Sequence, residues 1–592
     1  IPIGLYSWKV DSRFGNVTYI PVDTLQHAFQ NSNDMGGYTG QYNYLGNLGS
    51  PRLSRIFFDR RDPSQYFFTD PYDFCVQRPE DVIFTNTFSP FTNLSYYKGG
   101  GSRDGEERFK SYFAINANKR LGFGFYIDYL YGRGLYQDQS TAFFNGGLFS
   151  SYRGDKYDMH FIFNNDNLKM AENGGITDDR YITNPLDMAE GKKEYSANEI
   201  PTRLSQIWNH NTSYHAFLTH RYNLGFYKEK QDSVDTDSVK ITQVFVPVTS
   251  FIHTLQVDLN NRKYISYDDA QNQKYFEHNY LGTDSIDKTK RTSIKNTIGI
   301  ALQEGFNKWA KAGLTAFLSY EYRNFALTDT TNIPGQRIIN NYKESSLSIG
   351  GELSKKQGKL LHYNILGELA IAGEDAGQFS VEGRGDLNLR LFGDTVRLDV
   401  NAFIKNQNPV FYFRHFQSKH YWWDNNDLSK IMRTRLEGKL SLNRWGTQLR
   451  AGVENIKNYT YLANASIPVK DSEGNVTGFK NNAAVRQHSG NIQIFTAMLQ
   501  QKLKVGIFHL DGEVAYQKSS EQDILPLPEL SAYGNLYMKF GLAKKVLQIE
   551  MGADVRYFSK YYAPDYSPVI GQFYNQNPDD KIEIGAFPIV NV

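Results

Sequence analysis

The chain has 592 residues, and its charges nearly cancel, with 65 Lys and Arg against 63 Asp and Glu. It contains 40 Phe and 41 Tyr, which is too aromatic for a disordered protein. Balanced charge without a dense Lys/Arg cluster argues against a nucleic-acid partner. No run of about 18 apolar residues occurs, so a transmembrane helix is excluded, whereas a transmembrane β-barrel is compatible with this composition.

The two ends of the chain suggest processing. The opening IPIGLYSWKV lacks the basic and apolar regions of a signal peptide. The final FPIVNV stops within an alternating apolar run. We therefore expect a processed or trimmed N-terminus and C-terminal strands that are incomplete, so that Val592 is not taken as the natural end.

Residues 1–91 differ from the rest of the chain. The segments RIFFDRRDP and QYFFTDPYDF alternate poorly and carry Pro where a strand within a ladder would not tolerate it. We expect an irregular N-terminal segment that folds inside a barrel as a plug or lies beneath it in the periplasm. A set of irregular first strands is the alternative.

Residues 92–592 show the period-two alternation of β-strands, whose successive side chains point to opposite faces. In residues 378–391, apolar side chains such as Phe379 and Val381 alternate with polar ones. The alternation resumes at 396–405, where Phe403 interrupts the polar face. Earlier strands are predicted at 92–98, 108–118, 122–134, 143–152, 156–169, 212–228 and 250–267. The pattern predicts an all-β, transmembrane antiparallel β-barrel of about 18–22 strands.

The lengths of the connectors support a barrel in a membrane. From residue 293 onward, short connectors such as 392–394 alternate with longer ones such as 407–429. Outer-membrane barrels combine short periplasmic turns with long extracellular loops, so we expect that arrangement here. The connector at 229–249 breaks the alternation, and we expect an irregular periplasmic excursion there.

Three stretches carry a family resemblance. They are VPVTSFIHTL at 246–255, HYWWDNND at 420–427 and LPLPELSAYGNLYMKF at 525–540. Together with the strand spacing, they resemble the putative porin family of Bacteroidetes outer-membrane β-barrel proteins. The resemblance implies a barrel in the outer membrane of a Gram-negative bacterium and a pore, and it implies no catalytic residue.

Motifs for catalysis do not appear in the sequence. There is no G-x-S-x-G, H-E-x-x-H or Walker-type sequence, so we expect no enzyme and no cofactor. An outer-membrane hydrolase, with a triad assembled from distant residues, is the alternative. The single cysteine, Cys75, excludes an intramolecular disulfide and a thiolate zinc site.

No metal site is expected either. His210, His215 and His220 are five residues apart, which places successive members on opposite faces of a strand. Two acidic loop groups offer oxygen ligands of the kind that calcium accepts, but neither has the complete EF-hand spacing. We expect solvated loops, with structural calcium as the alternative, at Asp232, Asp235 and Asp237 and at Asp424, Asn425, Asn426 and Asp427.

The charged residues on the polar strand faces carry the functional prediction, because rings of charge set the selectivity of pores. A charge on the lipid face would cost about 2–4 kcal/mol at the midplane, so we expect these residues to face the lumen. Alternatively, they pair with one another and fill a narrow or plugged interior. The lumen-lining candidates are Glu382, Arg384, Asp386, Arg390, Arg397, Asp399, Arg433, Arg435, Glu437 and Arg450.

Aromatic residues near predicted strand ends are expected to lie at the membrane–water boundary, where amphipathic rings gather. A sugar-stacking platform in an external loop is the alternative. These interfacial candidates are Tyr421, Trp422, Trp423, Tyr561 and Tyr562.

The sequence therefore predicts an outer-membrane, porin-like barrel that serves as a passive diffusion channel for small hydrophilic solutes. The alternative is a non-conducting barrel that acts as a scaffold or partner in a larger outer-membrane complex for assembly or secretion. The expected partners are outer-membrane lipid, small polar solutes and, under the alternative, other outer-membrane proteins. A gated importer of large chelates is disfavoured, because residues 1–91 are short and irregular for its plug domain.

Overall fold

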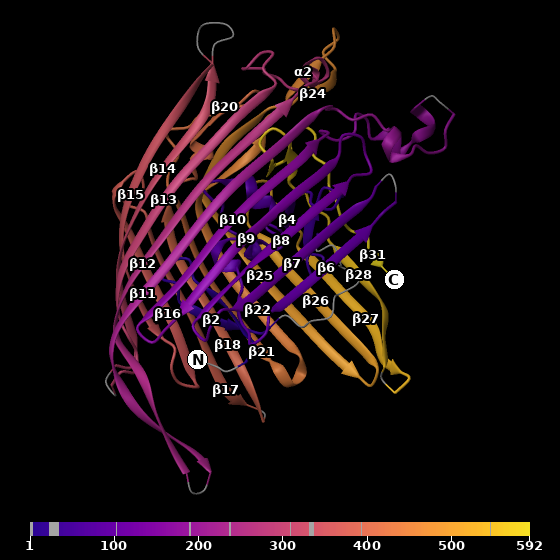
Figure 1. Cartoon of the computed structure of the whole chain (residues 1–592). Helices are drawn as coiled ribbons and strands as arrows, with labels where there is room; N and C mark the ends of the chain where they lie inside the picture. Colours follow the sequence, from indigo (N-terminus) through magenta and orange to yellow (C-terminus); the bar gives the residue numbers. More distant parts are fainter. Residues whose placement is uncertain are drawn as a thin grey trace.

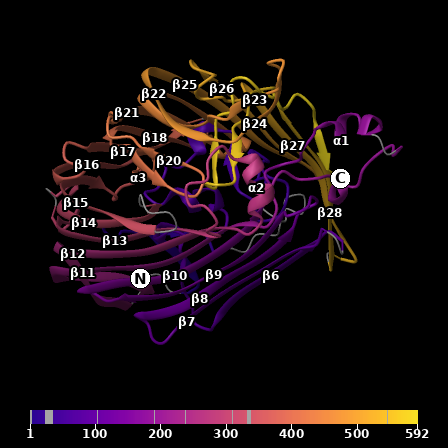
Figure 2. The same cartoon turned by 90° about the horizontal axis from the view of Figure 1, so that it is seen from above.

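The computed structural model describes residues 4–22, 35–101, 104–188, 191–235, 238–307, 310–330, 337–391, 393–544 and 546–591. Twenty strands of the described residues form one closed antiparallel barrel. Figures 1 and 2 show this barrel from the side and from above. The predicted fold class and strand number are confirmed. Within the described ranges, no helix is both long and apolar enough to cross a membrane.

The barrel strands follow the chain order around the wall, and the last, short strand lies between β28 and β6. They are β6 (Phe91–Gly99), β7 (Glu106–Asn116), β8 (Leu121–Arg133), β9 (Ser140–Arg153), β10 (Tyr157–Glu172), β11 (Ile207–Asp235), β12 (Ser238–Ser266), β13 (Ile286–Leu302), β14 (Gly313–Thr330), β15 (Arg337–Lys355), β16 (Leu361–Gly373), β17 (Phe379–Leu391), β18 (Asp394–Gln407), β21 (Ile431–Leu442), β22 (Thr447–Asn464), β25 (Ala483–Val505), β26 (Phe508–Ser519), β27 (Leu530–Leu542), β28 (Leu547–Phe558) and β31 (Ile589–Asn591).

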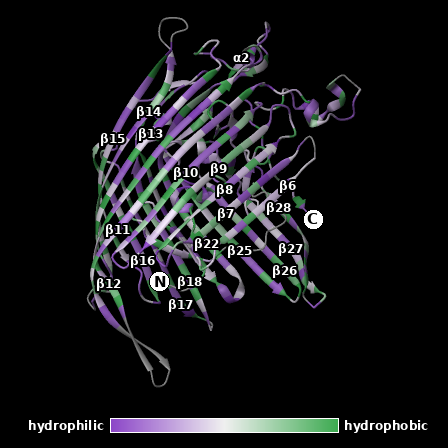
Figure 3. Cartoon of the chain, in the orientation of Figure 1, coloured by the Kyte–Doolittle hydropathy of each residue, from purple (hydrophilic) through white to green (hydrophobic). Residues whose placement is uncertain are grey.

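The alternation in the sequence sorts side chains between the outer face and the interior. Figure 3 shows hydrophobic and hydrophilic residues following one another along the strands. In β17, Val381 is exposed, while the carboxylate of Glu382 lies 3.0 Å from the Lys405 ammonium of β18. An apolar outer surface and a polar interior are what a barrel in a lipid bilayer requires.

Connector lengths differ between the two ends of the barrel. Short turns such as 117–120 and 443–446 lie at one end, called the turn end here, and long loops such as 173–206, 408–430 and 559–588 lie at the other, called the loop end. One turn contains η7 (Asn443–Trp445). The loops contain α1 (Arg180–Thr183), η5 (Pro185–Met188), η6 (Ala197–Glu199), α2 (Asp269–Tyr275), α3 (Phe411–Arg414), β19 (His415–Gln417), β20 (Trp422–Asp424), β23 (Ile467–Lys470), β24 (Val476–Lys480), β29 (Asp565–Ser567) and β30 (Gln572–Tyr574).

The irregular excursion expected at 229–249 is instead a paired β-hairpin extension of β11 and β12. β10 pairs with β11 up to Tyr222, and β13 pairs with β12 from Thr249, but β11 and β12 continue to pair with each other to Asp235 and Ser238. The resulting ribbon extends beyond the turn end in Figure 1. Its register shifts at Leu224/Gly225, where a side chain on Gly225 would collide with the carbonyl oxygen of Val246.

The N-terminal segment, described at residues 4–22 and 35–90, lies inside the ring of strands in Figure 2. The described residues of this segment contain one three-stranded sheet, one hairpin and three 3₁₀ helices. Its strands pair only with one another, so they do not form part of the barrel wall. The elements are β1 (Tyr6–Val10), β2 (Val17–Ile20), β3 (Tyr42–Tyr44), β4 (Arg52–Ser54), η2 (Phe57–Asp59), η3 (Phe67–Tyr72), η4 (Pro79–Asp81) and β5 (Phe84–Asn86).

Candidate functional site in the barrel interior

The N-terminal segment is held by the inner faces of strands on several sides of the barrel. Trp8 donates its indole N–H to His160 of β10 at 3.1 Å. Thr39 donates its hydroxyl to Glu513 of β26 at 2.8 Å. Arg13 pairs with Glu368 of β16 at 2.5 Å. Because these contacts reach strands on several sides of the barrel, the N-terminal segment is packed against the wall, and it is called the inner body below.

Two carboxylates of this segment join basic residues of the wall. Asp59 lies 2.5 Å from Arg450 of β22. Asp62 forms ion pairs with Arg433 of β21 and, at 3.3 Å, with Lys405 of β18. The wall residues also have partners within the wall, because Arg450 is 2.6 Å from Glu437. The inner body is therefore connected to an existing network of wall charges.

A buried carboxylate lies at the centre of this network. Glu454 of β22 accepts from Arg433 at 2.7 Å and from Arg435 at 2.6 Å, and its side chain is 0 % exposed. Phe403, which interrupts the polar face of β18, provides a ring for these cations, with the Arg435 guanidinium 5.2 Å from its centroid. The phenylalanine thus belongs to the charged wall.

The pKa values of two inner-body carboxyl groups are shifted in opposite directions. Burial raises the pKa of Asp62, but the charges of Arg433 and Lys405 outweigh this effect and hold the pKa below its ordinary value. Burial raises the pKa of Asp70 to about 6, although Arg78 and the Ser64 backbone N–H oppose the increase. Docking of the N-terminal segment is therefore linked to pH.

A cavity of about 880 Å³ lies between the inner body and one side of the wall. It reaches Lys355, Lys356 and His362, which are near the turn between β15 and β16. Six of the predicted lumen residues line this turn-end cavity, and they carry both signs of charge. They are Arg384, Asp386, Arg397, Asp399, Glu437 and Arg450.

A second cavity of about 310 Å³ lies nearer the loop end, bordered by Val410, Phe413 and Pro526. It is also lined by Arg433. Tyr42 and Asp59 line both cavities, so these inner-body residues lie between the two spaces. Asp59 pairs with Arg450 at this boundary, and Asp62 lines the second cavity.

Aromatic residues pack together at the loop end of the interior. The Phe67 ring of the inner body stacks on Tyr412 of α3 with centroids 5.3 Å apart. On the other side of α3, Phe411 stacks on Phe325 of β14 at 3.8 Å. The loop 408–430 is thereby connected to both the inner body and the wall, and apolar side chains occupy this end of the barrel.

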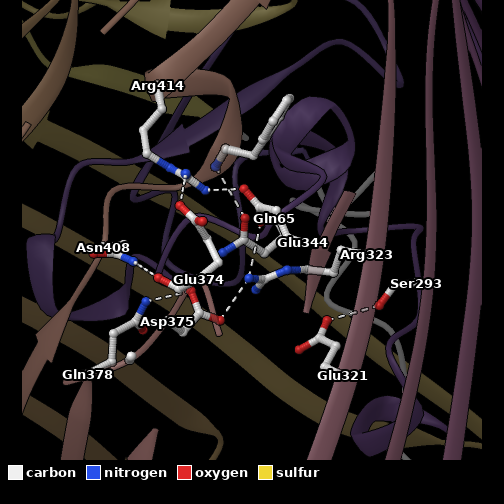
Figure 4. Close-up of polar contacts among 12 residues, drawn as sticks. Gln65, Ser293, Glu321, Arg323, Glu344, Glu374, Asp375, Gln378, Asn408 and Arg414 are labelled. Carbon is white, nitrogen blue, oxygen red and sulfur yellow. Dashed lines mark hydrogen bonds and ion pairs between the residues drawn. The ribbon is translucent and has the colours of Figure 1, made fainter. Parts of the chain in front are cut away.

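Two arginines and three carboxylates fasten the same loop to the wall, as Figure 4 shows. Arg414 lies 2.7 Å from both Glu344 and Glu374. Arg323 lies 3.1 Å from Glu344 and 2.7 Å from Asp375. The inner body joins this cluster because Gln65 accepts the backbone N–H of Phe411 at 3.2 Å. This cluster could not be predicted from the sequence, because its residues come from strands and loops far apart in the chain.

The structure also gives the positions of the remaining lumen candidates. Glu382 pairs with Lys405, and Arg435 lies 4.3 Å from the ring centroid of Phe58 in the inner body. Arg390 is exposed near the turn that follows β17. Asp59 and Asp62, which meet the wall candidates, lie in the RIFFDRRDP segment, and their partners could not be read from its sequence.

The interfacial expectation is wrong for three of the five aromatic candidates. Tyr421 and Trp423 are buried in the loop-end cluster, and Tyr561, which belongs to the loop 559–588, is buried in a cluster with Phe558 and Ala563. The Tyr421 hydroxyl contacts Asn481 and lies 3.0 Å from the Ser567 hydroxyl. Their loops fold over the interior, so proximity to a strand end did not place them against lipid. Trp422 and Tyr562 are exposed.

The described residues contain no group of three or more His, Cys, Asp or Glu side chains suited to a metal ion. Asp424 pairs with His415 at 2.5 Å, and Asn425 donates to the Phe413 carbonyl at 2.9 Å. Asp237 and the side chains of Asp232 and Asp235 lie outside the described residues. His210 contacts Asn167, His215 contacts Asp258 and His220 contacts His253, so the three histidines have separate partners.

A family model described as Putative porin matches residues 4–592, which include both the inner body and the barrel. The chain belongs to this family. A search of curated proteins finds no match to this member of the porin family.

Solved structures provide an independent comparison of the fold. The siderophore receptor PirA from Acinetobacter baumannii is 9 % identical with a TM-score of 0.54, and the match covers 86 % of this chain and 75 % of that one. The copper transporter OprC is 9 % identical with a TM-score of 0.55, and the match covers 93 % and 84 %. A mutant of the ferric enterobactin receptor PfeA from Pseudomonas aeruginosa is 11 % identical with a TM-score of 0.52, covering 85 % and 71 %.

At these identities the similarity concerns the fold alone. Together with the family match, it identifies the porin-family chain as a transport barrel of the bacterial outer membrane. The short turns then face the periplasm and the long loops face the exterior.

Proposed function

We propose that this protein is an outer-membrane channel for small hydrophilic solutes that is closed in the conformation described above and opens when the N-terminal segment moves. The observation that carries the proposal is that Tyr42 and Asp59 line both cavities and lie between them. A displacement of the inner body there would join the periplasmic cavity to the one near the loops. Such a channel differs from a permanently open diffusion pore because it contains a gate.

The charges along this path indicate the solute class. Arg384 and Arg397 face the same cavity as Asp386 and Asp399. Walls of both signs hold water and orient polar molecules, whereas a strong preference for anions or cations requires one sign to dominate. We therefore infer weak ion selectivity and passage of neutral or zwitterionic polar solutes.

The packing at the loop end supports a gate. A solute that passes from the exterior must move the aromatic cluster of Phe67, Phe411 and Tyr412 or the loop that carries it. The loop 408–430 contacts the inner body through Phe67 and through Gln65. Movement of the inner body would therefore release one support of that loop.

The occluded interior also favours the second candidate function, a non-conducting barrel that serves as a partner in a larger outer-membrane complex. Under this proposal the N-terminal segment is a permanent filling. The two functions differ in one measurable property, because only the first requires the inner body to move during function.

A reversible cross-link tests the choice in the full-length chain. In a C75S background, T39C and E513C place thiols where a hydrogen bond of 2.8 Å now joins the inner body to β26. We expect single-channel openings in a planar bilayer, their loss after reaction with a short bis-thiosulfonate linker, and their return after reduction. T39C alone, treated with the same reagent, is the control.

Each result separates the functions. Openings that continue in the cross-linked protein would contradict the gate and favour a permanently open pore. A protein that is silent before cross-linking and after reduction, although correctly folded, would favour the non-conducting partner.

A further inference from the structure

A row of basic side chains crosses the outer face of four neighbouring strands close to the loop end. Lys169 of β10 lies opposite His210 of β11, His210 opposite Lys263 of β12, and Lys263 opposite Lys288 of β13. The four strands run side by side in Figure 1. This set, Lys169, His210, Lys263 and Lys288, is called the basic row.

The neighbours in sequence show that the row faces outward. Each row residue has a direct sequence neighbour that is buried inside the barrel: Met170, Asn209, Arg262 and Asp287. Adjacent residues of a strand point to opposite faces, so the row residues point away from the interior. Lys169 and Lys288 are exposed accordingly.

The described residues supply no counter-charge for this row. Like charges directly opposite one another destabilise a sheet. Among the described residues, none of the three lysines forms an ion pair, and His210 contacts the neutral side chain of Asn167 at 2.9 Å. The next outward positions on either side contain no carboxylate: Ala171, Asn167, Trp208, Thr212, Ile265, Asn261, Ile286 and Lys290.

The position of the row corresponds to the edge of the bilayer. Four residues nearer the turn end, about 13 Å along the strands, the outward side chains of Tyr214 and Leu259 are exposed. The Lys169 ammonium lies 5.4 Å from the centroid of the Trp208 ring, and tryptophan is typical of the boundary between lipid and water. Lysines at this level are tolerated at little cost, in contrast to lysines at the midplane.

We propose that the basic row binds the phosphorylated headgroup of a lipid in the outer leaflet. Four residues on adjacent strands span about 14 Å, which is wide enough for a headgroup with more than one phosphate. Each lysine offers three N–H donors to phosphate oxygens. The lipid supplies the negative charge that the row lacks, and its chains lie against the apolar surface below.

Native mass spectrometry of the full-length protein in detergent tests this proposal. The probe is diphosphorylated lipid A, compared with the same lipid after removal of its phosphates, and excess inorganic phosphate is the competitor. The variant K169Q/K263Q/K288Q removes the row's lysines. The matched control K98Q/K457Q/K518Q removes three exposed lysines on β6, β22 and β26 that are not opposite one another.

We expect the row variant to bind diphosphorylated lipid A about tenfold more weakly than the parent protein, and the control to bind it like the parent. Dephosphorylated lipid should bind both proteins weakly and equally. Heat-dependent gel mobility verifies that both variants are folded barrels. Equal binding by the row variant and the parent, equal binding of both lipid forms, or complete displacement by inorganic phosphate would overturn the proposal.

Discussion

Asp59 of the N-terminal segment and Arg450 of β22 form an ion pair of 2.5 Å although 391 positions separate them in the sequence. Asp59 lines both interior cavities, and Arg450 lines the one at the turn end. Arg450 also has a partner within the wall, Glu437, at 2.6 Å. The pair therefore connects docking of the inner body to the boundary between the two cavities.

Removal of the two inner-body carboxylates should loosen this docking. Asp59 and Asp62 are 39 % and 42 % exposed, so each D-to-N change should cost about 1 kcal/mol after solvent screening. For D59N/D62N we expect cleavage of the N-terminal segment by added protease to increase about fivefold to thirtyfold, with more frequent channel openings. The control D155N/D178N removes carboxylates from exposed ion pairs and should match the parent.

The stability of the barrel wall should depend strongly on Glu454. Its fully buried carboxylate neutralises both Arg433 and Arg435, so E454Q leaves two cations with one fewer counter-charge. We expect a loss of about 3–5 kcal/mol, seen as barrel unfolding at a lower temperature in heat-dependent gel mobility. Glu382 is 30 % exposed, and E382Q should cost under about 1 kcal/mol. Equal effects of the two changes would contradict this assignment.

Loss of the side-chain hydroxyl should have different effects at Tyr421, which is buried in the loop-end cluster, and at Tyr562, which is exposed. Y421F removes a buried hydroxyl that contacts Asn481 and Ser567, and should cost about 1 kcal/mol and speed proteolysis of the loop 408–430. Tyr562 is exposed, so Y562F should leave the rate unchanged. If Y562F had the larger effect, the interior position of Tyr421 would be of no consequence for loop stability.

The stability of the docked segment should increase as the pH falls from about 7 to about 5. Burial raises the pKa of Asp70 to about 6, so the folded protein binds a proton more readily than the unfolded chain does. This contribution is complete below the ordinary pKa of 3.8 and is lost as the pH rises through about 6. Asp62, whose pKa is lowered, acts in the opposite sense and only at more acidic pH.

The substitution D70N isolates the contribution of the Asp70 carboxyl to this pH dependence. It should stabilise docking near neutral pH by about 1–3 kcal/mol and remove the pH dependence between about 4 and 7. Protease resistance of the N-terminal segment across this range provides the measurement. A pH profile of D70N that follows the parent would assign the dependence to other groups.

Local pattern was sufficient to predict the wall. Alternation such as Val381 next to Glu382 determines which face of a strand meets lipid, because consecutive side chains point in opposite directions. The same rule anticipated the inward positions of Arg433 and Arg450. The alternation of short and long connectors gave the wrong expectation at 229–249, where β11 and β12 pair with each other beyond the last contacts with their neighbours.

The contents of the barrel were decided by tertiary structure alone. The sequence contains Asp59, Asp62 and Tyr421, but their partners Arg450, Arg433 and Asn481 are distant in the chain, and no local period specifies such pairings. An irregular segment has no alternating face to indicate its environment. The sequence by itself therefore determined an outer-membrane barrel with a charged interior, whereas the filling of that interior depended on long-range packing of the N-terminal segment and loops.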